Sequence, residues 1–128
     1  MLALGTVKLK GMDEKFNLLT GLIQSKVTHR YAGDIDAESC FECLTFSSNA
    51  QSANFVGLEY LTGRIGSRRG GFILQHVGSI KSGKSESTLN VLTGSGTGDL
   101  VGIKGHGRST WSGINGQPSQ VLLEYHFD

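Results

Sequence analysis

Hydrophobic and polar residues alternate along most of this chain with a period of two, the spacing of a half-buried β-strand. The alternating runs span roughly residues 4–10, 21–33, 35–48, 53–65, 69–80, 85–93, 100–112 and 119–127. Gly, Ser, Asn and Asp residues separate these runs and favour turns. Residues 11–20 either extend the first strand or form a short helical turn. No segment has the sustained 3.6-residue repeat of an amphipathic helix.

The short connections between the runs predict a meander, in which each strand pairs with the next strand along the chain. A meander of eight strands removes its free edges by closing on itself. We therefore expect an all-β, eight-stranded antiparallel closed barrel formed by a single domain, residues 1–128. A two-sheet sandwich is the alternative, although sandwiches usually need longer crossovers than this chain has.

The dipeptide Gly66-Ser67 fits a two-residue turn with glycine first, and this turn sets the register of the hairpin around it. The register places Gly57 opposite His76 and Glu59 diagonal to His76, about 7–8 Å away at the backbone. The inward face then alternates aromatic residues with glycine, as the interior of a tapering barrel does. It carries Phe55, Gly57, Glu59, Leu61, Phe72, Leu74 and His76.

The same alternation assigns inward positions on the other strands. These are Val27, His29 and Tyr31, then Phe41 and Cys43, then Val101, Ile103, Gly105, Gly107 and Trp111, and finally Val121, Leu123, Tyr125 and Phe127. The outward face of the central hairpin is also apolar, with Val56, Leu58, Tyr60, Ile73 and Val77. Such a face suggests coverage by another subunit or a terminal segment, and we expect a homo-oligomer.

Composition agrees with a β-rich chain, because 19 of its 128 residues are glycine and only one is proline. Glycine at this density disfavours long helices and suits tight turns. A formal net charge of +1 gives no reason to expect a nucleic-acid or membrane partner. The chain has neither a signal-peptide pattern at its start nor about 20 consecutive apolar residues, so we expect a cytoplasmic protein.

Three motifs give weak chemical signals. Cys40 and Cys43 form a CxxC pattern, but they alternate between faces of a strand and no second pair completes a metal site, which favours two free thiols. The glycine-rich segment 94–98 lacks the Lys-Ser/Thr of a phosphate loop, which favours a turn. Three arginines, Arg64, Arg68 and Arg69, gather at one hairpin tip without aromatic neighbours that would mark a strand-binding groove. We expect no cofactor and no metal.

Four segments carry a resemblance to a known family: FVGLEYLTG at 55–63, FILQHVG at 72–78, GSGTGDL at 94–100 and YHFD at 125–128. Together they resemble small bacterial proteins of unknown function with an allene-oxide-cyclase-like barrel fold. The glycine-rich turn and the strand after it are similar to a segment of plant allene oxide cyclases and dirigent proteins. The resemblance implies a barrel that holds a hydrophobic small molecule, but no cyclase catalytic residue can be matched onto this chain.

Glu59 and His76 are the candidate catalytic residues, because a carboxylate beside an imidazole in an apolar cavity tunes a general base. The alternative is a buried pair that only fixes register. Candidate ligand-binding residues are Tyr31, Tyr125, Trp111, Phe55 and Phe72. The leading hypothesis is a barrel that binds a small apolar molecule, with proton-transfer or cyclase/isomerase-type chemistry if it is an enzyme. The other hypothesis is a structural or protein-interaction barrel with a solid core that acts through oligomerisation.

Overall fold

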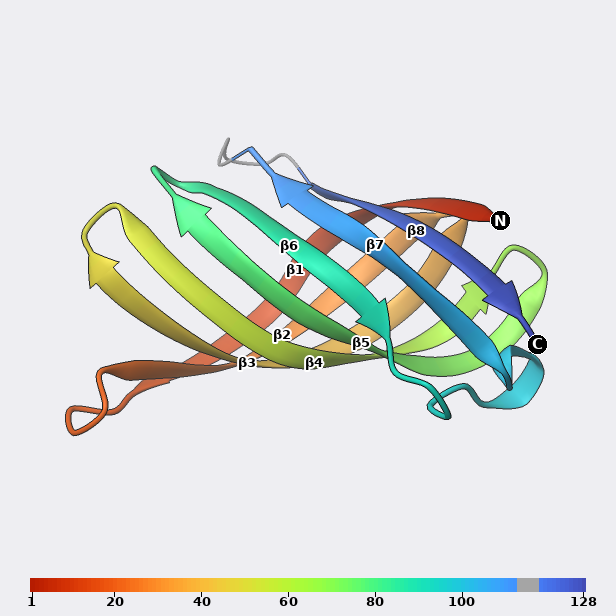
Figure 1. Ribbon diagram of the computed structural model, residues 1–128, viewed down its shortest axis with the longest axis horizontal. Helices are drawn as coiled ribbons and strands as arrows, with labels where there is room; N and C mark the ends of the chain where they lie inside the picture. The colour runs from red at the N-terminus through yellow and green to blue at the C-terminus, as the bar shows by residue number, and fades with distance from the viewer. Residues whose placement is uncertain (113–117) are drawn as a thin grey trace.

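The computed structural model describes residues 1–112 and 118–128, and this part of the chain is almost entirely β-structure (Figure 1). Its elements are β1 (Leu2–Phe16), β2 (Leu22–Gly33), β3 (Ile35–Asn49), β4 (Ser52–Ile65), β5 (Arg68–Lys81), β6 (Lys84–Val91), the short 3-10 helix η1 (Gly98–Leu100), β7 (Ile103–Trp111) and β8 (Ser119–Phe127). Consecutive strands pair antiparallel. The prediction of eight antiparallel strands in meander order is confirmed.

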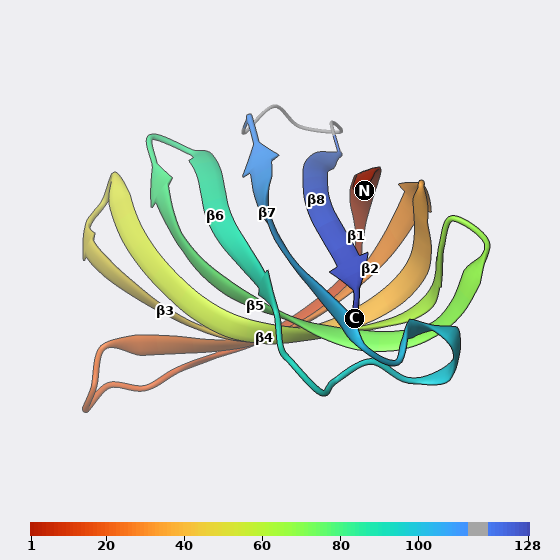
Figure 2. The ribbon, with the colours of Figure 1, turned by 45° about the vertical axis from the view of Figure 1, so that its right-hand side comes forward.

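The first strand also pairs with the last one, so the order from β1 to β8 closes on itself as a barrel. This pairing covers only the first part of β1, from Leu2 opposite Glu124 to Val7 opposite Ser119. The rest of β1 pairs with β2 alone. Figures 1 and 2 show the resulting β1–β2 hairpin extending away from the other strands. The sheet is therefore closed at one end and spread at the other.

The turn between β4 and β5 has the predicted geometry. Ile65 pairs with Arg68, and Gly57 consequently lies opposite His76. Gly66, at the first turn position, has a φ of 59°, a conformation that favours glycine. This register fixes which side chains of the hairpin point into the barrel, because a slip of one residue would exchange the two faces.

The structure corrects one predicted strand and resolves an ambiguity at another. Residues 11–16 continue β1 rather than forming a helical turn. The seventh strand begins at Ile103 instead of residue 100, because residues 98–100 form η1. Leu100 is therefore buried, and Val101, which we expected inside, is 67% exposed.

Beyond the end of β6, the glycine-rich segment before η1 lies along β5 and forms hydrogen bonds with it. The Gly71 amide donates to the Thr97 hydroxyl oxygen, and the Thr97 amide donates to the Gly71 carbonyl. The Ile73 amide likewise donates to the Ser95 hydroxyl oxygen. The segment therefore pairs with backbone groups of β5 that β6 does not reach. This arrangement is that of a connecting turn.

The closed end of the sheet contains the hydrophobic core. Its largest buried side chains include Tyr31, Ile35, Leu61, Phe72, Leu74, Leu89, Leu100, Ile103 and Leu123. Inward positions on β8 are occupied as the alternation predicts, with Val121 and Leu123 fully buried. No helix among the described residues has the length and apolar character to cross a membrane.

Candidate functional site

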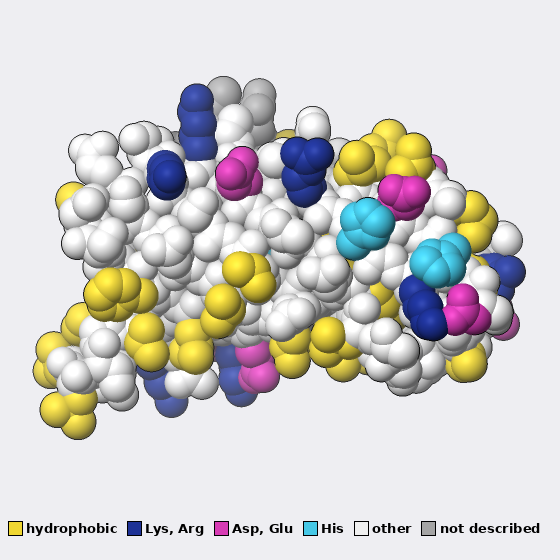
Figure 3. Space-filling model, viewed as in Figure 1, with side chains coloured by type: hydrophobic (Ala, Val, Ile, Leu, Met, Phe, Trp, Pro, Cys, Tyr) yellow, Lys and Arg dark blue, Asp and Glu magenta, His cyan; other side chains and the backbone are white. Residues whose placement is uncertain are grey.

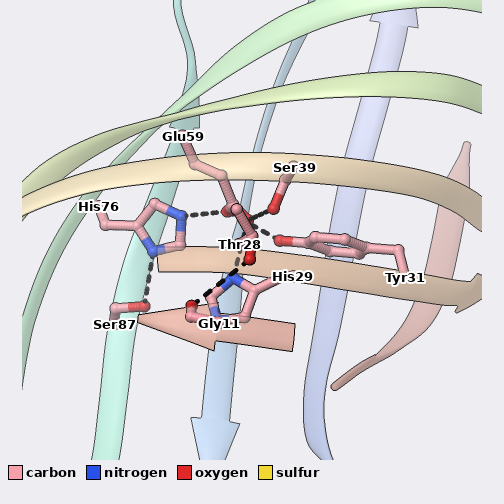
Figure 4. A network of polar contacts seen from close by, with 8 residues as sticks. All are labelled: Gly11, Thr28, His29, Tyr31, Ser39, Glu59, His76 and Ser87. Carbon is pink, nitrogen blue, oxygen red and sulfur yellow. Dashed lines mark hydrogen bonds and ion pairs between the residues drawn. The ribbon is translucent and has the colours of Figure 1, made fainter. Parts of the chain in front are cut away.

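A buried carboxylate lies where the packed end of the barrel meets the open end. Glu59 on β4 has no solvent exposure, and its two oxygens contact four side chains (Figure 4). Oε1 accepts hydrogen bonds from the Tyr31 hydroxyl at 2.8 Å and from Nε2 of His76 at 2.7 Å. Oε2 accepts from the Ser39 hydroxyl at 2.5 Å and from Nδ1 of His29 at 3.2 Å. Both lone-pair regions of each oxygen are thus occupied.

Strand register brings these groups together from four neighbouring strands. His29 on β2 lies opposite Ser39 on β3, and Phe41 on β3 lies opposite Glu59 on β4. His76 reaches the carboxylate from β5, two positions along from Leu74, the residue opposite Glu59. Because inward residues recur every second position, these side chains all point into the barrel at about the same level.

The hydrogen bonds keep Glu59 ionised. Burial raises the pKa of this carboxyl, but hydrogen bonds from His29 and His76, attraction to His76 and the Ser39 hydrogen bond lower it more. The net pKa of Glu59 lies well below its ordinary value. The pKa of Tyr31 is raised by burial, by the negative charge of Glu59 and by the hydrogen bond to it, so this hydroxyl remains a donor.

An ionised carboxylate only accepts hydrogen bonds, and this fixes which nitrogen of each histidine carries a proton. His29 donates from Nδ1 and His76 donates from Nε2. In the neutral imidazoles, Nε2 of His29 and Nδ1 of His76 are then left as acceptors. Nδ1 of His76 lies 3.4 Å from the Ser87 hydroxyl, whereas Nε2 of His29 has no hydrogen-bond partner among residues 1–112 and 118–128.

A cavity of about 960 Å³ opens above this cluster, in the spread end of the sheet. Both histidines and the ring of Phe41 line it, and the Phe41 ring lies 4.4 Å from the His76 ring. Glu59 and Tyr31 lie behind the histidines and do not line the cavity. A molecule in the cavity would therefore meet the two imidazoles, while the carboxylate acts on it through them.

The structure brings some of the predicted site residues together and separates others. Glu59 and His76 are in direct contact, Tyr31 joins them through its hydroxyl, and Phe55 and Trp111 line the cavity. Phe72 and Tyr125 do not line it. Phe72 lies in the hydrophobic core, and Tyr125 packs edge-to-face on Phe127 with ring centres 6.1 Å apart. Both residues sit on strand segments at the packed end of the barrel.

His29 and Ser39 are site residues that the sequence did not single out. Alternation on the second strand places His29 inside the barrel, but its distance from Glu59 depends on two successive strand pairings, β2 with β3 and β3 with β4. The sequence feature that predicts this contact is the tight turn after Gly33. It pairs Tyr31 with Ala37 and hence His29 with Ser39, which brings both toward the fourth strand.

The cysteines form no joint site. Cys40 is exposed and Cys43 is half-buried in the cavity wall, and both are free thiols. Burial raises the pKa of the Cys43 thiol, which disfavours the reactive thiolate. In the described part of the chain, no three His, Cys, Asp or Glu side chains form a group that could hold a metal ion.

Comparisons with known proteins place the chain beside others without an assigned activity. The family model described as "Protein of unknown function (DUF3224)" matches residues 5–125. A crystal structure of a DUF3224 protein of unknown function from Shewanella oneidensis is similar, with a TM-score of 0.82 and 24% sequence identity. The match covers 100% of this chain and 97% of that one, and it shows a shared fold. No curated protein matches the chain.

Proposed function

This chain belongs to the DUF3224 family of proteins of unknown function, and we propose that it binds a small molecule in the open end of its barrel and exchanges a proton with it. The observation that carries this proposal is the pair of imidazoles held by Glu59 at the floor of a cavity of about 960 Å³. A cavity of this size suits a small organic ligand. The resemblance to allene-oxide-cyclase-like barrels supports the same placement of the ligand.

In this proposal His29 is the proton acceptor. Its Nδ1–H is held by Oε2 of Glu59, so Nε2 carries the lone pair and belongs to a side chain that lines the cavity. An ionised carboxylate behind an imidazole stabilises the imidazolium that forms when the ring takes a proton. Glu59 is therefore a positioning residue, since its own oxygens are fully engaged and out of reach of a ligand.

His76 is the second imidazole held by Glu59 at the cavity floor, and both of its ring nitrogens are engaged. Its Nε2–H is bound to Glu59, and its Nδ1 meets the Ser87 hydroxyl at 3.4 Å. A proton taken from a ligand by Nε2 of His29 can be returned from that same nitrogen to another ligand atom, which restores the neutral imidazole with no net change in protons. This balance is that of an isomerisation or a cyclisation, which needs no other reactant.

Binding can be tested with Nile red, a neutral dye whose fluorescence rises in apolar surroundings. We expect saturable binding of one dye per chain. The variant Thr45→Trp adds bulk to the cavity wall and should abolish it. The control, Leu44→Trp, introduces the same side chain at an exposed position one residue away and should retain binding. Equal dye binding by both variants would place the dye outside the cavity and contradict the proposal.

Proton exchange can be tested by long-range ¹H–¹⁵N NMR of the histidine rings. We expect the Nδ1–H tautomer for His29 and the Nε2–H tautomer for His76 in the neutral protein. The variant Glu59→Gln should remove this preference at both rings. Opposite tautomers in the unmodified protein would leave His29 without a free lone pair facing the cavity, and the proposed role would fail.

A second candidate function rests on the outer surface of β3, β4 and β5. Leu44, Val56 and Val77 lie side by side on these strands, and Leu58 and Tyr60 extend the row along β4. All five side chains are at least 43% exposed. Figure 3 shows hydrophobic side chains in the lower part of the view, where these strands lie in Figure 1.

We propose that a second copy of the chain covers this row. Sedimentation velocity should show an oligomer that Val56→Asp dissociates. A monomer in the unmodified protein, with the same sedimentation coefficient in the variant, would contradict this candidate.

A further inference from the structure

Four serine side chains face the cavity from the last three strands: Ser85, Ser87, Ser109 and Ser119. Ser87 on β6 and Ser109 on β7 are directly opposite each other. Inward positions on the same strands at the packed end hold large apolar residues such as Leu89 and Leu123. The change from leucine to serine along one inward face leaves space at the open end and adds hydroxyl groups to its wall.

Three of these hydroxyls are available to a ligand. The Ser87 hydroxyl is engaged with Nδ1 of His76. The side chains of Ser85, Ser109 and Ser119 make no hydrogen bond with any residue in the described ranges. Each hydroxyl can donate one hydrogen bond and accept others, so together they suit the carbonyl, ether or hydroxyl oxygens of a bound molecule.

The opposite side of the cavity carries apolar and aromatic residues, together with Ser25, Thr45 and Ser47. The rings of Phe41 and Phe55 lie on β3 and β4, and Val27 and Leu9 continue this surface across β2 and β1. Apolar and aromatic surface of this kind covers the ring or chain of a ligand and removes it from water. The serines of β6, β7 and β8 thus share the cavity with the phenylalanine rings of β3 and β4.

The charge around the cavity disfavours an anionic ligand. Glu59 carries a negative charge just behind its floor, and Glu14 adds a second carboxylate to its lining. The one Lys or Arg in the described lining, Lys8, is exposed and lies between the inward residues Val7 and Leu9 on β1. A carboxylate or phosphate placed near the histidines would therefore lose water without gaining a fixed cation.

We propose that the cavity takes an uncharged, oxygen-bearing molecule with an apolar ring or chain. Its apolar part lies against Phe41 and Phe55, and its oxygens meet the hydroxyls of Ser85, Ser109 and Ser119. This inference rests on the proposed function, because it names the ligand class for the same cavity. It extends the small apolar molecule expected from the sequence, since the sequence-based inward assignments include none of these serines.

Calorimetric titration with three matched probes tests the ligand class: 2-naphthalenemethanol, 2-methylnaphthalene and 2-naphthoate. These share one ring system and differ in having a neutral hydroxyl, no oxygen or a negative charge. We expect the alcohol to bind about threefold to tenfold more tightly than the hydrocarbon, the effect of one or two net hydrogen bonds. The carboxylate should bind most weakly. Equal affinities, or tightest binding of 2-naphthoate, would overturn the inference.

The serine row itself is tested by the triple variant Ser85→Ala, Ser109→Ala and Ser119→Ala. It should reduce affinity for the alcohol to that for the hydrocarbon and leave the hydrocarbon unchanged. The control, Thr88→Ala with Thr110→Ala, removes exposed hydroxyls from β6 and β7 and should change neither. Unchanged alcohol binding in the triple variant would also overturn the inference. If Nile red binds while the three probes bind alike, only the ligand class fails; if no dye or probe binds, the proposed function fails too.

Discussion

His29 on β2 and His76 on β5 bind different oxygens of one carboxylate, although two strands separate them in the sheet. Nδ1 of His29 lies 3.2 Å from Oε2 of Glu59, and Nε2 of His76 lies 2.7 Å from Oε1. The carboxylate thereby links β2, β4 and β5 across the inside of the barrel. Such a link both orients the imidazoles toward the cavity and stabilises the closed arrangement of the strands.

Replacing Glu59 with Gln should destabilise the fold, because a neutral amide cannot accept hydrogen bonds from all four of the present donors. Breaking a buried charged network in this way costs about 3 kcal/mol. We expect a decrease of that order in the free energy of unfolding measured in urea. Glu86→Gln is the control, since Glu86 lies exposed on β6. A change as small as that of the control would show that the network adds nothing to stability.

The stabilising effect of Glu59 should depend on pH in the acid range. Its pKa is lowered by folding from the ordinary value of 4.5, so its contribution is fully present above pH 4.5 and is lost as the pH falls below that value. The difference in unfolding free energy between the unmodified protein and Glu59→Gln should therefore shrink on acidification. The pKa of Asp128 is also lowered, by a hydrogen bond from Lys104. Because Asp128 is present in both proteins, its contribution to the unfolding free energy cancels in this difference.

A difference that stays constant from pH 6 down to the acid transition would contradict this prediction, because it would mean that Glu59 has the same pKa in the folded and unfolded chains. Chemical denaturation at a series of pH values measures the difference directly. The comparison of two proteins at each pH removes the contributions of all other carboxyl groups.

Alternation was enough to predict most of the fold, but not the full site. Period two and the turn at Gly66 fixed the pairing of β4 with β5, and through it the contact between Glu59 and His76. A contact between side chains on adjacent strands depends on the one turn that joins them. His29 lies two strands from Glu59, so predicting their contact requires the pairings of β2 with β3 and of β3 with β4 to be combined.

The cavity was harder to foresee for a different reason. The sequence shows which side chains point inward, but it does not show where along the strands β1 stops pairing with β8. Because this pairing ends at Val7, the barrel is packed at one end and spread at the other. Phe72 and Phe55 lie on neighbouring strands with similar patterns, yet one fills the core and the other lines the cavity.

Tyr31→Phe should remove the alkaline sensitivity of the fold. The pKa of Tyr31 is raised above its ordinary value of 10.0, so the unmodified protein should lose stability as the pH rises beyond 10.0, where the unfolded chain releases the proton first. Phenylalanine has no proton to lose. At neutral pH the variant should be less stable by about 1–3 kcal/mol, the effect of losing one hydrogen bond to a charged group.

Unfolding at increasing pH, followed by circular dichroism in a fixed concentration of urea, measures this effect. The unmodified protein should unfold more readily above pH 10.0, and the variant should show a flatter profile. Tyr60→Phe serves as the control, because Tyr60 is 45% exposed on the outer face. Parallel profiles for all three proteins would exclude Tyr31 as the source of any alkaline transition.

Gly57→Ala should disturb the floor of the cavity. A Cβ added at Gly57 would come closest to the carbonyl oxygen of Glu42 and would lie 2.6 Å from Cε1 of Phe41 and 2.8 Å from Cα of Cys43, and such contacts do not occur without movement. The Phe41 ring would have to shift from its position beside His76. We expect a loss of about 1–3 kcal/mol in stability, typical of overpacking, together with weaker Nile red binding.

Gly5→Ala is the matched control for this change. The nearest atoms to an added Cβ at Gly5 lie 3.6 Å away, an ordinary contact distance. This variant should keep both its stability and its dye binding, because β1 has room for the methyl group. If Gly57→Ala behaved as Gly5→Ala does, the Phe41 ring would not be held against the glycine, and the proposed cavity floor of Phe41 and the two histidines would lose its structural basis.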